Sequence, residues 1–309
     1  MTKNILRYVL ALILFSKCGS DNDVIPIDKE PDLENPSNGV YSIPIVVHIL
    51  HNDEPLGEGG NLSEARILKQ IESLNNDYRK RQGTNGFNDH PDGTDAKVEF
   101  VLASQTPEGK QSNGIVRINM LDVDNPMESN STFDYCAYYS YWNPEEYLNI
   151  WTVPYLELTD VFLGLGTGPE TDLPGKDALA KGEPFQAEGV IINAGHFGES
   201  SLSTTYNLGR TLTHEVGHYL GLLHPWGLGD CDFNDYCADT PKVNVPVTSC
   251  TPAIGCDGEE IQVQNYMNWS PDDCMNMFTN DQAFRMHYVL ENSPRRKTLL
   301  SSKGLQEPL

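Results

Sequence analysis

Apolar residues lie along the chain in short runs, separated by stretches rich in Pro, Gly, Asp and Asn. Residues 43–50 (IPIVVHIL) are β-branched and almost continuously apolar, which predicts a strand buried on both faces. Residues 62–79 start with Ser63-x-x-Arg66 and then carry apolar side chains at helical spacing. We therefore predict a helix that packs on this strand.

Further apolar runs predict the rest of a sheet. Residues 98–103, 148–153 and 190–193 are predicted strands. Residues 161–166 (VFLGLG) have glycine at two positions, which suits an edge strand that another backbone passes closely. Two intervening stretches, 122–144 and 167–184, are dense in Pro, Gly, Asp and Asn and are predicted to be long surface loops.

The N-terminal region has the pattern of an export signal. Two basic residues precede the apolar run 8–15, which is too short to span a bilayer, so residues 1–18 are interpreted as a signal peptide. Cys18, followed by GSDND, resembles the lipidated cysteine of a bacterial surface lipoprotein, although Lys17 replaces the usual small residue. Plain secretion is the alternative. Residues 19–40 are acidic and are predicted to be a flexible tether.

Charge and cysteine content limit the compartments in which the protein can work and the partners that it can bind. The chain has 44 acidic and 21 basic side chains, a net charge of −23, which excludes a nucleic-acid partner because phosphate binding needs clustered Lys and Arg. We expect a monomer that meets a membrane only through the N-terminal lipid. Five of the seven cysteines lie in the last third, which favours disulfides formed in an oxidising compartment: Cys231, Cys237, Cys250, Cys256 and Cys274.

The segment HEVGHYLGLLH, which begins at His214, carries the candidate chemistry. His214 and His218 are four residues apart, so a helix places both imidazoles on one face, where they can share one cation. Gly221 can adopt the left-handed conformation that ends a helix, after which the chain can turn to bring in His224 as third ligand. Three neutral imidazoles leave a fourth position open, which indicates catalytic zinc. Glu215 lies beside this face and can act as a general base.

This motif, followed by Met267 in the sequence NYMN, is the pattern of the metzincin metalloproteases. The chain is similar to the pappalysin family, including its ulilysin-type members, over about residues 41–291. The similarity lies in YNLGRTLTHEVGHYLGLLHPWG, CDFNDYCADTP and NYMNWSPDDCMNMFTNDQAFRM. It implies an α+β metzincin fold. An upper lobe, about 41–221, holds a twisted five-stranded mixed sheet and the active-site helix. An irregular lower lobe, about 222–295, holds the Met-turn and a C-terminal helix at about 279–290, before a tail at 296–309.

The resemblance also implies roles within a cleft between the lobes. The substrate lies along the edge strand at 161–166, and Met267 forms a hydrophobic floor beneath the zinc. Glu215 takes a proton from water and later gives it to the leaving amine. Trp269 stands where family members have a Tyr thought to donate a hydrogen bond to the oxyanion. The second stabilising donor is therefore either lost or rebuilt from the indole N–H.

Two further sites are implied by the resemblance. Asp272 matches an Asp in the pocket for the residue after the cleaved bond, which predicts cleavage before Arg or Lys. The alternative is that Asp272 and Asp273 are solvated loop residues. Calcium is expected in the acidic loop at Asp235, Thr240 and a carbonyl near Asn234. The alternative there is an acidic turn without a cation.

The resemblance pairs four cysteines in the lower lobe, as Cys231–Cys256 and Cys250–Cys274. Cys136 and Cys237 are left over, and one option is that they pair with each other. The predicted function is a secreted or surface-tethered zinc endopeptidase that acts on protein or peptide substrates. The alternatives are a catalytically weak, metzincin-like surface binding protein and a zinc hydrolase of small amides.

Overall fold

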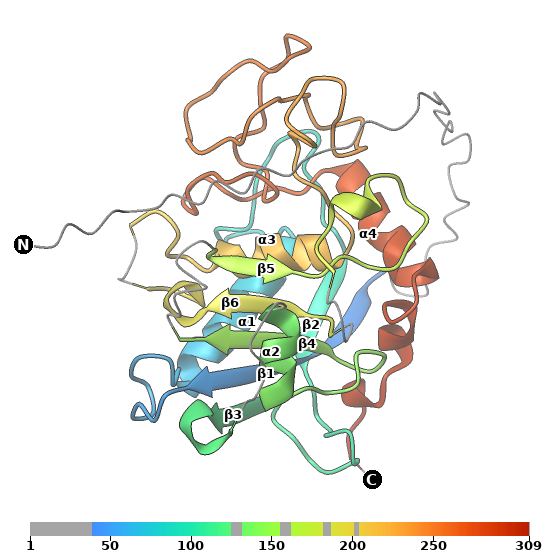
Figure 1. The fold of residues 1–309 in the computed structure, drawn as a ribbon. Coiled ribbons are helices and arrows are strands. Elements are labelled where there is room, and N and C mark those ends of the chain that lie inside the picture. Colours follow the sequence, from blue (N-terminus) through green and yellow to red (C-terminus); the bar gives the residue numbers. More distant parts are fainter. Residues whose placement is uncertain (1–38, 125–131, 155–161, 182–186, 201–203, 309) are drawn as a thin grey trace, which may run out of the picture. The chain divides into compact units, whose positions relative to one another are not determined.

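The computed structural model describes residues 39–308 except 125–131, 155–161, 182–186 and 201–203 (Figure 1). The proposed signal peptide with Cys18, and nearly all of the tether, therefore lie outside the described residues. No helix within the described ranges is long and apolar enough to cross a membrane.

A mixed sheet lies at the centre of this part of the chain, with strand order β2-β1-β4-β6-β5 (Figure 1). The third strand, β3, pairs with the second half of β1, beyond the half that pairs with β2. All pairings are parallel except that of β5 with β6, so β5 forms an antiparallel edge. The strands are β1 (Tyr41–His51), β2 (Val98–Leu102), β3 (Ile115–Asn119), β4 (Leu148–Val153), β5 (Gly164–Gly166) and β6 (Val190–Asn193).

The described residues also form four α-helices, of which two have well-defined starts. Ser63 accepts a hydrogen bond from the N–H of Arg66, which caps the first helix. Thr279 and Gln282 form a reciprocal capping box at the last. The helices are α1 (Glu64–Tyr78), α2 (Thr132–Tyr139), α3 (Arg210–Tyr219) and α4 (Asn280–Asn292). Short 3-10 helices are η1 (Met120–Asp122), η2 (Lys176–Ala178), η3 (Ala194–His196), η4 (Lys297–Ser301) and η5 (Lys303–Leu305).

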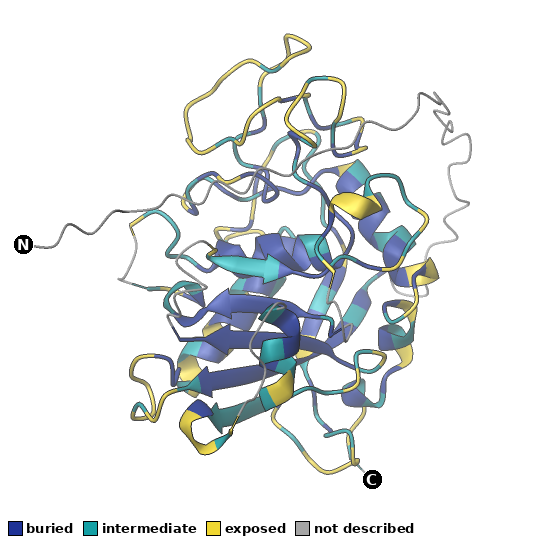
Figure 2. Cartoon of the chain, in the orientation of Figure 1, coloured by how far each residue is buried: buried dark blue, intermediate teal, exposed yellow. Residues whose placement is uncertain are grey.

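Both faces of the sheet are covered, as the continuous apolar run at β1 predicts (Figure 2). Successive strand residues point to opposite faces, so Ile43, Ile45, Val47 and Ile49 share one core cluster with α1 and α3. Leu50 lies in a second cluster on the other face, together with residues of α2 and β4. The sheet is thus enclosed between α1 and α3 on one side and α2 on the other.

The strands predicted at 148–153 and 190–193 are confirmed, and those at 43–50 and 98–103 differ by one or two residues at an end. The prediction of a loop throughout 122–144 is wrong, because α2 lies within it. The sequence TFDYCAYY contains no Gly or Pro and buries Phe133 and Cys136, so its packing against the sheet outweighs the loop-like composition around it. Strand β3 was not predicted.

The lower lobe is irregular, as the resemblance implies: residues 221–279, all described, contain no helix or strand. Two disulfides link its loops, Cys231–Cys256 and Cys250–Cys274. Each closes a loop of about 25 residues, which stabilises the fold by roughly 3 kcal/mol through the unfolded chain. Cys136 and Cys237 are both free and buried, so the option that they pair with each other is wrong.

Candidate active site

Helix α3 carries His214 and His218, and a tight turn after it carries His224. The turn begins at Gly221, whose φ is +90°, in the left-handed region. The N–H of Gly221 donates to the His218 carbonyl and that of Leu222 to the Gly217 carbonyl, a Schellman ending. The expected role of Gly221 in ending the helix is therefore what the backbone shows.

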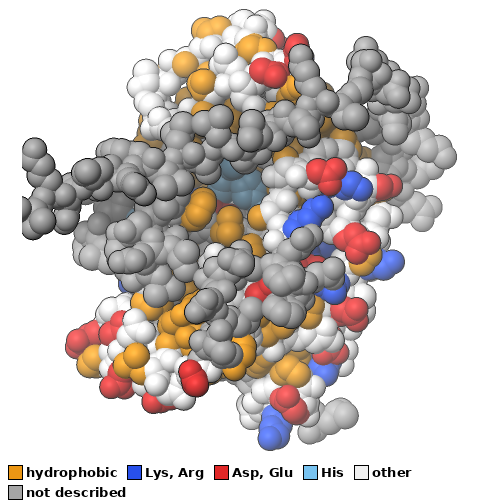
Figure 3. Space-filling view, in the orientation of Figure 1, with side chains coloured by type: hydrophobic (Ala, Val, Ile, Leu, Met, Phe, Trp, Pro, Cys, Tyr) orange, Lys and Arg blue, Asp and Glu red, His pale blue; other side chains and the backbone are white. Residues whose placement is uncertain are grey.

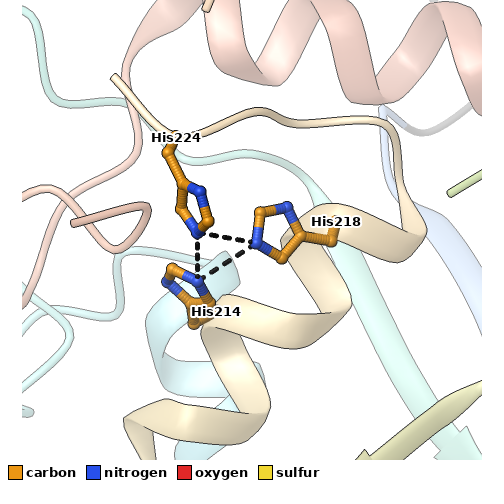
Figure 4. A group of neighbouring side chains, drawn as sticks. All are labelled: His214, His218 and His224. Carbon is orange, nitrogen blue, oxygen red and sulfur yellow. Dashed lines mark hydrogen bonds between the residues drawn. The ribbon is translucent and has the colours of Figure 1, made fainter. Parts of the chain in front are cut away.

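The three imidazoles meet at their Nε2 atoms (Figure 4). The Nε2–Nε2 distances are 3.1 Å for His214–His224, 3.1 Å for His214–His218 and 3.0 Å for His218–His224. Nitrogens this close can reach one ion at Zn–N distances of about 2.0–2.1 Å. Among the described residues this is the one group of three histidines arranged to share an ion.

Hydrogen bonds and burial keep the His214 and His218 rings neutral. The Nδ1 of His214 lies 2.7 Å from the Tyr266 carbonyl, and the Nδ1 of His218 lies 2.8 Å from the Leu222 carbonyl. A carbonyl can only accept, so Nδ1 holds the proton and Nε2 presents a lone pair. Burial lowers the pKa of His214 to about 3 and that of His218 to about 4. The donor set therefore fits a zinc ion.

His224 is held by aromatic rings. Trp226 stacks on it with ring centroids 4.2 Å apart and planes 10° apart. Trp269 meets the His224 ring edge-on at 5.6 Å and Trp226 at 5.0 Å. Trp269 is 46% exposed, so it lies at the surface beside His224. The role of Trp226 was not predicted, although its position two residues after the third histidine could have suggested it.

The loop that contains Met267 lies directly under α3. The Tyr266 carbonyl accepts the His214 hydrogen bond, and Met267 is fully buried. The sulfur of Met267 occupies the place that a side chain at Gly217, between the two helical histidines, would need. Met267 therefore packs against α3 between the two helical histidines.

Glu215 belongs to α3, and its side chain lies between this helix and the edge strand β5. Its side chain is buried, which raises its pKa to about 8, and the N–H of Gly166 donates to its carboxylate. The glycines of β5 allow this approach: a Cβ at Gly164 would come within 2.7 Å of Glu215 Cγ, and one at Gly166 within 2.3 Å of the Glu215 carbonyl oxygen. The close backbone contact predicted for the edge strand is thus present, with the active-site helix as its partner.

Asp272 lies at the start of α3 and is 2% exposed. Its Oδ2 accepts hydrogen bonds from the N–H groups of Leu208, at 2.8 Å, and Arg210, at 3.2 Å. Within the described residues no hydrogen bond reaches the other oxygen, Oδ1. One oxygen is therefore anchored at the start of the helix that carries His214 and His218.

The acidic loop brings two of its three predicted calcium residues together. Asp235 is 1% exposed, and its Oδ1 accepts from Thr240 Oγ1 at 2.6 Å and from the Cys237 N–H at 3.2 Å. Its Oδ2 is buried and has no hydrogen-bond partner in the described structure. Asn234 precedes Asp235, and its side chain accepts from the Tyr236 N–H. A buried carboxylate oxygen without a donor fits a cation.

The metal centre is open to the surface. Figure 3 shows histidine side chains at the bottom of a hollow, beside hydrophobic side chains. The second group of metal-capable side chains in the described ranges is Cys250, Asp273 and Cys274. Both of those cysteines belong to a disulfide, so that group is not a metal site.

Known structures and curated proteins are similar to this chain over most of its length. Mirolysin with a bound compound is 30% identical and superposes with a TM-score of 0.70, covering 87% of this chain and 99% of mirolysin. Mature mirolysin of Tannerella forsythia with a cleaved peptide gives a TM-score of 0.67 at 30% identity, covering 84% and 95%. Among curated proteins, an extracellular metalloprotease of Arthroderma otae is 28% identical over 259 residues, 83% of this chain and 80% of the relative.

The fold, the three converging histidines and these likenesses define a metzincin zinc metalloendopeptidase. Residues 132–291 match the family described as Pregnancy-associated plasma protein-A, the M43 peptidases. The chain belongs to this family, which confirms the resemblance to the pappalysins.

Proposed function

We propose that this zinc endopeptidase uses His214, His218 and His224 as its metal ligands and Glu215 as its general base, and that it cleaves protein or peptide substrates before basic residues. The observation that carries the assignment is the convergence of the three Nε2 atoms within 3.1 Å of one another in a hollow open to the surface. The Glu215→Gln comparison argued in the Discussion tests the catalytic assignment.

Each residue contributes a separable step. Zinc, when bound, supplies a Lewis acid that polarises a carbonyl and lowers the pKa of water. Glu215 accepts a proton at its carboxylate and returns it to the leaving amine. The Gly166 N–H orients that carboxylate. Met267 packs against the helix at Gly217, between His214 and His218.

Trp269 is the proposed second donor to the substrate carbonyl oxygen. The supporting observations are that it lies against His224 and that it is 46% exposed. An indole N–H can only donate, which is the property that a developing oxyanion requires. In this proposal the indole replaces the phenol of other family members.

The specificity proposal rests on Asp272. Its Oδ2 is held by two amides at the start of α3, which leaves Oδ1 for a guanidinium or an ammonium group of the substrate. Because the same helix carries His214, the position of this carboxylate is fixed relative to the metal ligands.

We expect a peptide with Arg after the scissile bond to be cleaved roughly 10- to 100-fold faster than its Leu counterpart, since a hydrogen bond to a charged group contributes about 1.5–3 kcal/mol. Asp272→Asn keeps an oxygen for the two amides and should remove most of this preference. Asp273→Asn, at the exposed neighbour, is the matched control and should retain it. Equal kcat/KM of wild-type protein for both peptides would show that the specificity proposal is wrong.

Calcium is proposed as a structural ion at Asp235, Thr240 and a carbonyl near Asn234. The supporting observation is the buried Oδ2 of Asp235, which has no partner in the described structure. Calcium accepts both carboxylate and neutral oxygens, which this part of the loop offers.

Calcium should therefore raise the melting temperature of zinc-loaded protein. At a hundredfold excess over Kd, binding stabilises the folded state by about 2.7 kcal/mol. For a domain of this size we expect an increase of about 5–10 °C. Differential scanning calorimetry of EDTA-stripped, zinc-reloaded protein measures the change, and Asp235→Asn should abolish it. Identical melting with and without calcium would mean that the loop is a bare acidic turn.

Export to the cell surface or the medium completes the proposal. Its support is the signal-like N-terminal sequence, the two disulfides and the extracellular metalloproteases among the relatives. In the proposed surface-tethered form, Cys18 carries the lipid.

A further inference from the structure

The turn between the second and third zinc ligands contains carbonyl groups that a helix end leaves without partners. The Gly217 and His218 carbonyls are used by the Schellman hydrogen bonds, and the Leu222 carbonyl by the His218 ring. Two other carbonyls of this turn are those of Tyr219 and Gly221. Each accepts a hydrogen bond from a buried arginine that is distant in sequence.

The first arginine is Arg296, which is fully buried. Its Nε donates to the Tyr219 carbonyl at 3.0 Å, and its guanidinium lies 3.5 Å from the centroid of the Tyr219 ring. Its NH1 donates to Glu188 Oε2 at 2.6 Å. Arg296 therefore contacts both the backbone and the ring of Tyr219, the residue that follows His218, and also the carboxylate of Glu188.

The second arginine is Arg285 of α4, which is 4% exposed. Its Nε donates to the Gly221 carbonyl at 2.6 Å and its NH2 to the Pro174 carbonyl at 2.7 Å. The two guanidinium groups thus hold the turn at Tyr219 and Gly221. A cation also interacts favourably with the negative end of the α3 dipole.

Arg296 belongs to a segment to which nothing above assigns a role. The family match ends at residue 291, and the expected tail begins at residue 296. The segment runs down one side of the sheet after α4 (Figure 1) and forms η4 and η5. Ser302 donates to the Glu146 carbonyl, and Leu299 is fully buried, so the segment is anchored within η4 and directly after it.

We propose that Arg296 is a positioning residue for the zinc centre: from outside the family-matched region it fixes the end of α3, and so holds His218 in line with His214 and His224. The proposal rests on the assignment of these histidines as zinc ligands. Arg285 holds the other side of the same turn, so removal of Arg296 alone loosens the turn without freeing it.

A stabilising role alone would give a different result. Removing one partner of a buried ion pair is strongly destabilising when it leaves the other charge buried and unpaired. In Arg296→Met, Glu188 keeps Arg295, whose NH1 lies 2.8 Å from its Oε1, so no carboxylate is left without a cation. The effect of the substitution should therefore fall on the metal centre more than on the melting temperature.

The test measures zinc affinity by competition with a chromophoric chelator, together with the visible absorption of the cobalt-substituted protein, which reports ligand geometry. We expect Arg296→Met to weaken zinc binding by about 10- to 100-fold, as is typical when a group that orients a ligand is lost. The cobalt spectrum should change as well. Arg296→Lys, which keeps the charge but not the planar fork, should have an intermediate effect.

Arg295→Met is the matched control, because Arg295 shares Glu188 and is partly exposed. It should bind zinc within about twofold of wild type, well below the change expected from a lost orienting group. Wild-type affinity and spectrum in Arg296→Met would overturn the proposal, as would an equal loss in Arg295→Met. If near-UV circular dichroism shows that Arg296→Met is unfolded, Arg296→Lys decides by the same criterion. Absence of zinc from the wild-type protein would instead contradict the proposed function.

Discussion

Glu215→Gln should lower the rate of casein hydrolysis by about 10²- to 10⁴-fold, the usual contribution of a general acid or base. Gln has the shape of Glu but cannot accept and return the proton. The Gly166 N–H can still donate to the amide oxygen, so the fold around α3 should persist. A fluorogenic peptide assay measures kcat and KM, and the zinc content of each preparation is measured in parallel.

The zinc content of the variant shows whether a loss of activity comes from the missing carboxylate or from loss of the metal. The variant should keep the same zinc content as wild type, because its three histidines are intact. Glu72→Gln, at an exposed position of α1, is the control and should be fully active. If zinc-loaded wild type cleaves no faster than Glu215→Gln, the chain is a catalytically weak, metzincin-like binding protein.

The clearest strand signals in the sequence belong to the strands inside the sheet, although β2, at one end of the strand order, could also be predicted. β1, β4 and β6 are apolar without alternation because helices cover both faces, and such runs are visible in the sequence alone. β3 is half-exposed along its whole length, so its sequence IVRIN carries no such signal. α2 has only eight residues, and its packing partners in β4 and β6 come later in the chain.

At the metal centre, too, some features can be predicted from the sequence and others cannot. His214, His218 and Gly221 follow from helical spacing and helix termination, which are local properties. The neutral state of the rings depends on carbonyls at Tyr266 and Leu222 that only the folded chain brings close. Arg296 lies far along the chain from the helix that it contacts, and no pattern near it indicates a role. The metal-binding histidines can therefore be predicted from the motif, whereas the distant groups that orient their rings and the end of the helix cannot.

Asp272 shows how a residue predicted for one purpose has a second in the structure. The sequence prediction treats it as the floor of a specificity pocket, but its Oδ2 also accepts from the N–H of Leu208, just before α3, and from that of Arg210, the first residue of α3. Carboxylates at this end of a helix are stabilising. Substitutions that remove both oxygens would therefore confuse loss of specificity with damage to α3, which is why Asn is the informative replacement.

A substitution at the close contact between β5 and α3 should have a second large effect, on both stability and activity. Gly166→Ala would place a Cβ 2.3 Å from the Glu215 carbonyl oxygen, and this neighbour is backbone that cannot rotate away. Strand and helix must therefore separate, which should cost about 1–3 kcal/mol of folding free energy. A displacement of about 1 Å at the catalytic carboxylate should also lower kcat by about 10²-fold.

Gly168→Ala makes the matched comparison. Its Cβ would lie 2.4 Å from Leu179 Cβ, an equally close contact that does not involve α3. Both variants should melt at a lower temperature than wild type, but only Gly166→Ala should lose activity when each is assayed well below its own melting temperature. Equal loss of kcat in the two variants would mean that general destabilisation is responsible. Full activity in Gly166→Ala would mean that the contact between β5 and α3 does not position Glu215.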